Sequence, residues 1–90
     1  MKYRSRTDIV FQMLESANGG TTKTRIMYNA YISYAQLKEY LSTLIENGLI
    51  EHIAANNTYR TTPKGIDFMN AYQKMDDMSN FTSKLTLIEK

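Results

Sequence analysis

The residues with the clearest capacity for chemistry lie in one stretch, from Lys23 to Lys38, which combines cations, hydroxyls and an amide. Within it, Leu37 begins an apolar stripe at helical spacing, which leaves polar side chains on the opposite face. A glutamine can pair with adenine through two hydrogen bonds, a serine can bond to several bases, and cations bind phosphates. The stretch therefore predicts contacts to duplex DNA from Lys23, Arg25, Tyr28, Tyr31, Ser33, Tyr34, Gln36 and Lys38. An ordinary solvent-exposed helix face is the alternative.

Three of these residues are tyrosines, Tyr28, Tyr31 and Tyr34, which is a high density for a protein surface. A phenol can donate a hydrogen bond to a phosphate oxygen, but tyrosine also packs well where two helices meet. We therefore expect at least one of the three to lie in the core, and Tyr40 with it.

Two further candidates lie in a predicted β-hairpin. Residues 49–54 and 58–61 have strand character and enclose Asn56-Asn57, a pair that tolerates the left-handed backbone of tight turns. A hairpin tip of this kind can reach the DNA backbone or the minor groove, where Asn and Arg are favoured. Asn57 and Arg60 are the candidates here, with turn formation alone as the alternative for the asparagine.

The charge of the chain is uneven. The net charge is +2, yet residues 1–38 hold six basic and two acidic residues, whereas residues 39–90 hold five basic and seven acidic ones. A local positive field suits a polyanionic partner. The basic N-terminal residues Lys2, Arg4 and Arg6 could add phosphate contacts or serve only as a solvated terminus.

Most enzyme classes are excluded by what the composition lacks. The 90 residues include no cysteine and a single histidine, His52, so thiolate chemistry and histidine clusters are absent. The adjacent Asp76 and Asp77 point apart on a helix, which is poor geometry for paired acid–base catalysis. We therefore expect a protein that is not an enzyme and uses no metal or cofactor. With no apolar run near 20 residues and no signal peptide, we expect it to be cytoplasmic, without a membrane span.

The pattern of elements predicts a mainly helical fold with a small β-hairpin. Apolar periodicity indicates helices over about 6–17 and 23–30, and a third that begins after the N-cap Ser33 and ends at Asn47-Gly48. The hairpin follows, and Thr62-Pro63 opens a last helix. The order α-α-α-β-β-α is that of a winged helix-turn-helix, with a DNA-binding domain over 1–62 and a C-terminal dimerisation helix over 63–90.

The last helix carries more apolar residues than a unit of this size can cover. A second copy of the chain is the economical partner, so we expect a homodimer. Ser79-Asn80 interrupts the apolar side and leaves two alternatives, a continuous helix or a break near Ser79. The predicted dimerisation residues are Phe68, Tyr72, Met75, Met78, Phe81 and Leu85.

The stretch from Thr24 to Leu37, with Leu41 and the later Glu46-Asn47-Gly48-Leu49-Ile50, resembles the archaeal winged-helix DNA-binding proteins. The similar group is the small, roughly ten-kilodalton, chromatin-associated or regulator-like proteins of Sulfolobus and its relatives. The resemblance covers about residues 6–75. It implies a homodimer held by an antiparallel coiled coil of the C-terminal helices, with a winged helix at each end bound to double-stranded DNA in the nucleoid.

The function expected is therefore that of a dimeric DNA-binding protein, either a transcriptional regulator or a small architectural protein. The alternative is a winged helix that serves as a protein–protein interaction module without DNA. A DNA-binding protein should show its cations on one surface beside the start of the third helix. An interaction module should show an apolar patch there instead.

Overall fold

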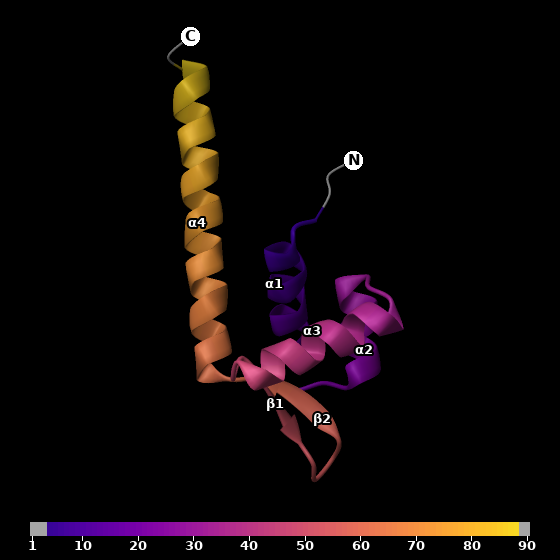
Figure 1. Cartoon of the computed structure of the whole chain (residues 1–90). Helices are drawn as coiled ribbons and strands as arrows, with labels where there is room; N and C mark the ends of the chain where they lie inside the picture. The colour runs from indigo at the N-terminus through magenta and orange to yellow at the C-terminus, as the bar shows by residue number, and fades with distance from the viewer. Residues whose placement is uncertain (1–3, 89–90) are drawn as a thin grey trace.

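The computed structural model describes the backbone of residues 4–88 and the side chains of residues 4–75. Three helices come first, then an antiparallel hairpin and a long final helix (Figure 1), which confirms the expected fold class and order. The elements are α1 (Arg6–Ala17), α2 (Lys23–Ala30), α3 (Tyr34–Glu46), β1 (Ile50–Ile53), β2 (Thr58–Thr61) and α4 (Pro63–Ile88).

Each of the first three helices begins at a hydroxyl that caps its first turn. The Ser5 side chain accepts from the Asp8 N–H and Asp8 accepts from the Ser5 N–H, which is a capping box. Thr22 caps α2 by accepting from the Arg25 N–H. Ser33 caps α3, as the sequence predicted. These local signals explain why the helix starts were readable from the sequence.

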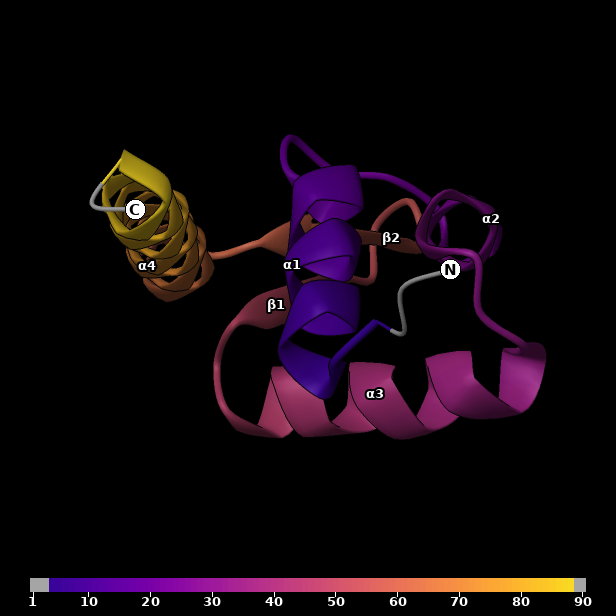
Figure 2. The same cartoon turned by 90° about the horizontal axis from the view of Figure 1, so that it is seen from above.

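The core lies where α1, α2 and α3 meet and is made of aliphatic side chains. In the view from above, the amino-terminal end of α1 lies over α3, and α2 lies near the amino-terminal end of α3 (Figure 2). Burying these side chains supplies the main stabilisation of the domain. The buried hydrophobic residues are Ile9, Met13, Leu14, Ala17, Ile26, Ala30, Ile32, Leu37, Leu41, Leu44 and Ile50.

The hairpin is short and in regular register. Ile50 faces Thr61 and Ile53 faces Thr58, and a single bridge between Thr21 and Tyr59 ties the loop before α2 to β2. Among the side chains of residues 4–75, Thr61 is the polar one that is buried, and its hydroxyl donates to the Leu14 carbonyl at 2.6 Å. The hairpin is thereby fixed to α1 at its base and projects away from the helices at its tip (Figure 1).

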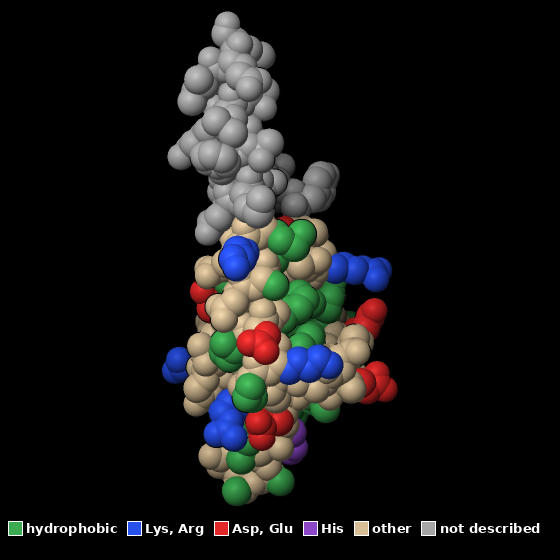
Figure 3. Space-filling model, turned by 90° about the vertical axis from the view of Figure 1, so that its left-hand side faces the viewer, with side chains coloured by type: hydrophobic (Ala, Val, Ile, Leu, Met, Phe, Trp, Pro, Cys, Tyr) green, Lys and Arg blue, Asp and Glu red, His purple; other side chains and the backbone are tan. Residues whose placement is uncertain are grey.

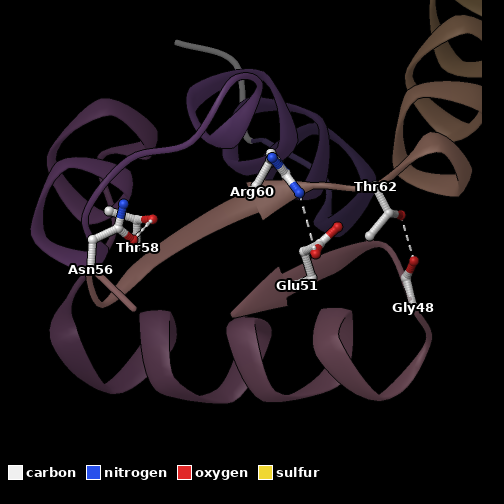
Figure 4. Close-up of polar contacts among 6 residues, drawn as sticks. All are labelled: Gly48, Glu51, Asn56, Thr58, Arg60 and Thr62. Atoms are coloured by element: carbon white, nitrogen blue, oxygen red, sulfur yellow. Dashed lines mark hydrogen bonds and ion pairs between the residues drawn. The ribbon is translucent and has the colours of Figure 1, made fainter. Parts of the chain in front are cut away.

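The start of α4 is fixed by Thr62 and Gly65. The Thr62 hydroxyl donates to the Gly48 carbonyl at 2.6 Å (Figure 4) and accepts from the Gly65 N–H at 3.1 Å. Gly65 packs so closely that a β-carbon there would lie 2.4 Å from the Leu49 carbonyl oxygen and 2.5 Å from Thr61 Cγ2. The glycine is therefore required by close approach of the backbone.

Gly65→Ala tests this contact, because two effects of opposite sign compete. Helix propensity alone would favour alanine by about 1 kcal/mol. The clash with a backbone oxygen is expected to dominate and to lower the free energy of unfolding by about 2 kcal/mol. Urea unfolding followed by circular dichroism measures the change, with Asn70→Ala on an exposed position of the same helix as the control. A Gly65→Ala protein as stable as the control would contradict the clash.

The first turns of α4 pack against α1. Phe68 and Met69 contact the core, and the ring of Tyr72 stacks on that of Phe11 with their centroids 4.6 Å apart. The Tyr72 hydroxyl also donates to an Asp8 carboxylate oxygen. The division of the chain at residues 62/63 stays a prediction, but this packing joins the first turns of α4 to the winged-helix part.

Beyond Tyr72, α4 continues without a break through Ser79 and extends past the end of α1 (Figure 1), so of the two alternatives the continuous helix holds. Met75 is 74% exposed. The side chains predicted to dimerise at positions 78, 81 and 85 lie outside those that the structure describes. Within the described part, Phe68 and Tyr72 already contact their own domain, which leaves Met75 free of such packing.

The Asp8–Tyr72 hydrogen bond makes stability depend on pH. This bond, followed by the backbone hydrogen bond from Ser5, lowers the pKa of the Asp8 carboxyl. A carboxyl whose folded pKa is lowered stabilises the fold above its unfolded pKa, and this contribution is lost as pH falls through the folded pKa. We expect Tyr72→Phe to lower the midpoint of thermal unfolding at pH 7, and the difference from the unmodified protein to shrink below about pH 4.

Thermal unfolding followed by circular dichroism at pH 7 and at pH 3 measures this difference. Phenylalanine keeps the ring that stacks on Phe11, so the substitution isolates the hydroxyl. Tyr28→Phe, which removes a hydroxyl from an exposed ring, is the matched control. If Tyr72→Phe lowered the unfolding midpoint equally at both pH values, the Asp8 carboxylate would not be the source of the lost stability.

Candidate nucleic-acid interface

The candidate residues on α2, on α3 and in the turn between them lie at the surface. Arg25, Ser33, Gln36 and Lys38 are exposed and Lys23 is half-buried. The three tyrosines Tyr28, Tyr31 and Tyr34 are 68%, 82% and 55% exposed. The expectation that one of them lies in the core is therefore wrong.

The reason is that smaller aliphatic side chains already fill the junction between α2 and α3. Ile26 and Ala30 from α2 and Ile32 from the turn are buried there, together with Leu37. Tyr28 is two residues from Ile26 and so points to the other side of the helix. Tyr40 is partly buried and packs against the core, in the direction expected.

Two cations from different helices converge on one ring. Lys23 Nζ from α2 and Lys38 Nζ from α3 each lie 5.7 Å from the centroid of the Tyr34 ring. At this distance a cation is attracted to the electron-rich face of an aromatic ring. The packing of α2 against α3 thus brings together two cations that are 15 positions apart in the sequence. With Tyr34 they form a positively charged surface at the start of α3, the α2–α3 surface.

This surface lacks compensating negative charge. The chain has no Asp or Glu between Glu15 and Glu39. Among residues 4–75, Arg60 with Glu51 is the ion pair that forms, and Lys23, Arg25 and Lys38 take no part in one. By contrast, the face on the α4 side shows Lys and Arg interspersed with Asp and Glu (Figure 3). The α2–α3 surface is therefore suited to an anionic partner.

At this surface, Ser33 and Gln36 cap the start of α3 through hydrogen bonds to each other. The Ser33 hydroxyl accepts from the Gln36 N–H at 3.2 Å, and Gln36 Oε1 accepts from the Ser33 N–H at 3.0 Å. Gln36 also lines a groove between α1 and α3, together with Arg6 and Tyr40. Their role as base contacts stays a prediction, and the amide nitrogen of Gln36 is the donor that the capping box does not use.

In the wing, formed by β1, β2 and residues 54–57 between them, polar side chains are paired with one another. Asn57 has the left-handed backbone (φ 55°) that the turn chemistry anticipated, and a hydrogen bond of 2.8 Å joins its Oδ1 to His52 Nε2. Arg60 lies 3.5 Å from Glu51 on the facing strand (Figure 4). The cation predicted to bind DNA from the wing is thus partly neutralised by its own hairpin.

Arg4 is a residue whose role the sequence did not reveal. Its guanidinium donates to the carbonyl oxygens of Ala30 and Tyr31, the latter at 2.7 Å, and to Gln12 Oε1. Arg4 therefore binds the carbonyl end of α2, where a cation is favoured, instead of projecting as part of a flexible arm. No local pattern could have shown this, because the partners are 26 and 27 residues away.

In the part of the chain that the structure describes, no helix is long and apolar enough to cross a membrane. The same residues hold no group of three or more His, Cys, Asp or Glu side chains arranged to bind a metal ion.

Comparison with known proteins agrees with this fold. The model of the winged helix-turn-helix family matches residues 3–80. No curated protein matches the chain. Among solved structures, the chain is similar to Sso10a-2, a DNA-binding protein from Sulfolobus solfataricus, with a TM-score of 0.76 and 24% identity over 96% of this chain and 95% of that one. At that identity the likeness is one of fold, whereas the family model covers most of the sequence. The chain belongs to the winged helix-turn-helix family.

Proposed function

We propose that this protein binds double-stranded DNA as a homodimer and acts by binding, without catalysis. The observation that carries the proposal is the convergence of Lys23 and Lys38 on Tyr34, at the start of α3, in a stretch without carboxylates. In helix-turn-helix docking, the amino-terminal part of this helix enters the major groove. The fold it shares with a DNA-binding protein from Sulfolobus solfataricus supports the same conclusion.

The residues divide into two roles. Lys23, Arg25 and Lys38 bind phosphates, with a weaker contribution from Arg60 because Glu51 holds it. The exposed start of α3 supplies the sequence preference, through Tyr34 and the free amide nitrogen of Gln36. Asn57 and the rest of the wing follow the DNA backbone or the minor groove. Tyr28 and Tyr31 lie on either side of the point where α3 enters the major groove.

Dimerisation through α4 is supported by the length of this helix. It spans 26 residues, but the packing on α1 extends only to Tyr72 within the described side chains, and Met75 is exposed. A helix that projects into water without a partner is marginally stable. Hydrophobic side chains also gather on the α4 side of the molecule (Figure 3). A second copy of the chain would cover this side and bring two α3 helices onto one duplex.

A duplex titration at several salt concentrations tests the proposal, with a random fragment and a native promoter fragment side by side. With three or more phosphate contacts, the logarithm of the affinity should fall against the logarithm of the salt concentration with a slope of about −3 or steeper. Tight, salt-sensitive binding to both fragments would indicate an architectural role. A strong preference for the promoter fragment would indicate a transcriptional regulator. Binding that is unchanged up to several hundred millimolar salt would refute it.

The alternative function, a protein–protein interaction module, fits the small net charge and the exposed Met75. It requires an apolar patch on the α2–α3 surface. What this surface exposes instead is tyrosine beside lysine, while the leucines of α3 are buried. This composition favours DNA as the partner.

Glu51→Gln is expected to raise duplex affinity several-fold at low salt. The substitution releases Arg60 from its ion pair and removes a negative charge beside the wing, so Arg60 can reach a phosphate. Fluorescence anisotropy with a labelled duplex measures the change. Asp67→Asn changes the net charge equally at an exposed position of α4 and serves as the control. If both variants gain affinity alike, the net charge and not Arg60 is responsible.

A further inference from the structure

The three exposed tyrosines around the α2–α3 turn are not used by the fold. Tyr28 lies on the last turn of α2, Tyr31 in the turn and Tyr34 at the first position of α3. Among residues 4–75, their hydroxyl groups form no hydrogen bond, and none of the three rings belongs to the core. The Tyr34 ring has the Lys23 and Lys38 side chains beside it, and no ring contact is formed by Tyr28 or Tyr31 within these residues. Large aromatic faces exposed to water in this way point to an external partner.

Tyr31 shows this most clearly. Its backbone is left-handed (φ 54°, ψ 50°), which glycine adopts without the steric conflict that a β-carbon introduces. Its side chain is the most exposed of the three and makes no core contact. The turn needs the backbone conformation of this residue, and nothing in the described part of the fold needs its ring.

The chemistry around the rings selects the partner. Lys23 and Lys38 flank the Tyr34 ring at 5.7 Å, so two ammonium groups lie beside an exposed aromatic ring, and Tyr28 and Tyr31 expose two further rings on the preceding helix turn and loop. A single strand of DNA offers the complement, since its unpaired bases expose their faces and its phosphates lie between them. In a duplex the base faces are stacked on each other, and only their edges and the phosphates are accessible.

We propose that Tyr28, Tyr31 and Tyr34 form a stacking platform for unpaired bases of single-stranded DNA, with Lys23 and Lys38 on the adjoining phosphates. This activity goes beyond duplex binding and uses the same surface, so single-stranded and duplex DNA compete for it. Stacking has little sequence preference, because every base has an aromatic face.

The test compares three labelled probes by fluorescence anisotropy: a short oligothymidine strand, an abasic strand of equal length with the same phosphates, and a duplex. Oligothymidine should bind about tenfold more tightly than the abasic strand. Unlabelled duplex should displace it. Equal affinity for the thymidine and abasic strands would overturn the proposal, and so would tighter binding of an RNA of matching sequence.

Paired substitutions separate the ring from the hydroxyl. Tyr31→Leu and Tyr34→Leu should each weaken oligothymidine binding about tenfold, whereas Tyr31→Phe and Tyr34→Phe should bind within about twofold of the unmodified protein. Circular dichroism checks that all four fold. Phenylalanine variants as weak as the leucine variants would assign the contact to the hydroxyl and overturn stacking. If the unmodified protein binds the duplex but not oligothymidine, this inference alone is rejected. If it binds oligothymidine but not the duplex, only the proposed function is rejected.

Discussion

Reversing two charges, Arg25→Glu together with Lys38→Glu, is expected to reduce duplex affinity by roughly two orders of magnitude at low salt. Each substitution removes a phosphate contact and places a carboxylate where the DNA backbone would lie. The slope of the logarithm of affinity against the logarithm of salt concentration should also become shallower by about two. Both residues are exposed and form no ion pair among residues 4–75, and the internal contact of a charge that is lost is the one between Lys38 and the exposed Tyr34 ring, so we expect the fold to persist.

The measurement is a salt-dependent anisotropy titration, accompanied by thermal unfolding and by the mass in solution. Lys74→Glu is the control for Lys38→Glu, because both remove one positive charge and add one negative charge, and Lys74 is exposed on α4 away from α3. We expect the fold and the dimer to survive in every variant. Unchanged affinity in the double variant would show that the duplex does not contact this surface.

Placing two charges in the terminal half of α4, Met78→Asp with Leu85→Asp, is expected to convert the proposed dimer into a 10.4 kDa monomer. A carboxylate at a helix–helix interface is costly to bury, so association is lost while the winged-helix part, packed through Phe68 and Tyr72, remains folded. Duplex affinity should fall at least about 100-fold, because two linked binding sites gain effective concentration that one site lacks.

Size-exclusion chromatography with light scattering reports the mass, and anisotropy reports the affinity. Asn70→Asp with Gln73→Asp adds the same charge at two exposed positions of α4 and is the control. A dimer that persists in the Met78→Asp, Leu85→Asp variant would show that the protein associates through another surface. A monomer that keeps full affinity would show that one winged helix is sufficient for binding.

The features that the sequence predicted correctly are those encoded by neighbouring residues. Ser33 is the N-cap of α3, with its acceptor role to an N–H three residues away, and Asn57 supplies the left-handed position of the wing. Thr62-Pro63 marks the start of α4 in the same way. In each case the partner groups lie within one turn of the chain, so the pattern of residue types determines the geometry.

The features that the sequence did not reveal depend on distant partners. Nothing near Arg4 indicates that it will bind the carbonyl end of α2, and nothing near Tyr72 indicates that Asp8 is its acceptor. The expectation that one of Tyr28, Tyr31 and Tyr34 lies in the core failed for a related reason, since a tyrosine at a helix junction suits both the core and the surface. Whether such a tyrosine is buried or exposed depends on whether smaller side chains from α2, the turn and α3 already fill the junction.

The contact of Arg4 with Tyr31 has a practical consequence for how binding is monitored. A fluorescent dye attached beside Arg4 would lie next to a side chain that holds the helix-turn-helix corner. We expect its emission to report the arrival of nucleic acid at α3, whereas a large group attached at the same position would crowd the corner.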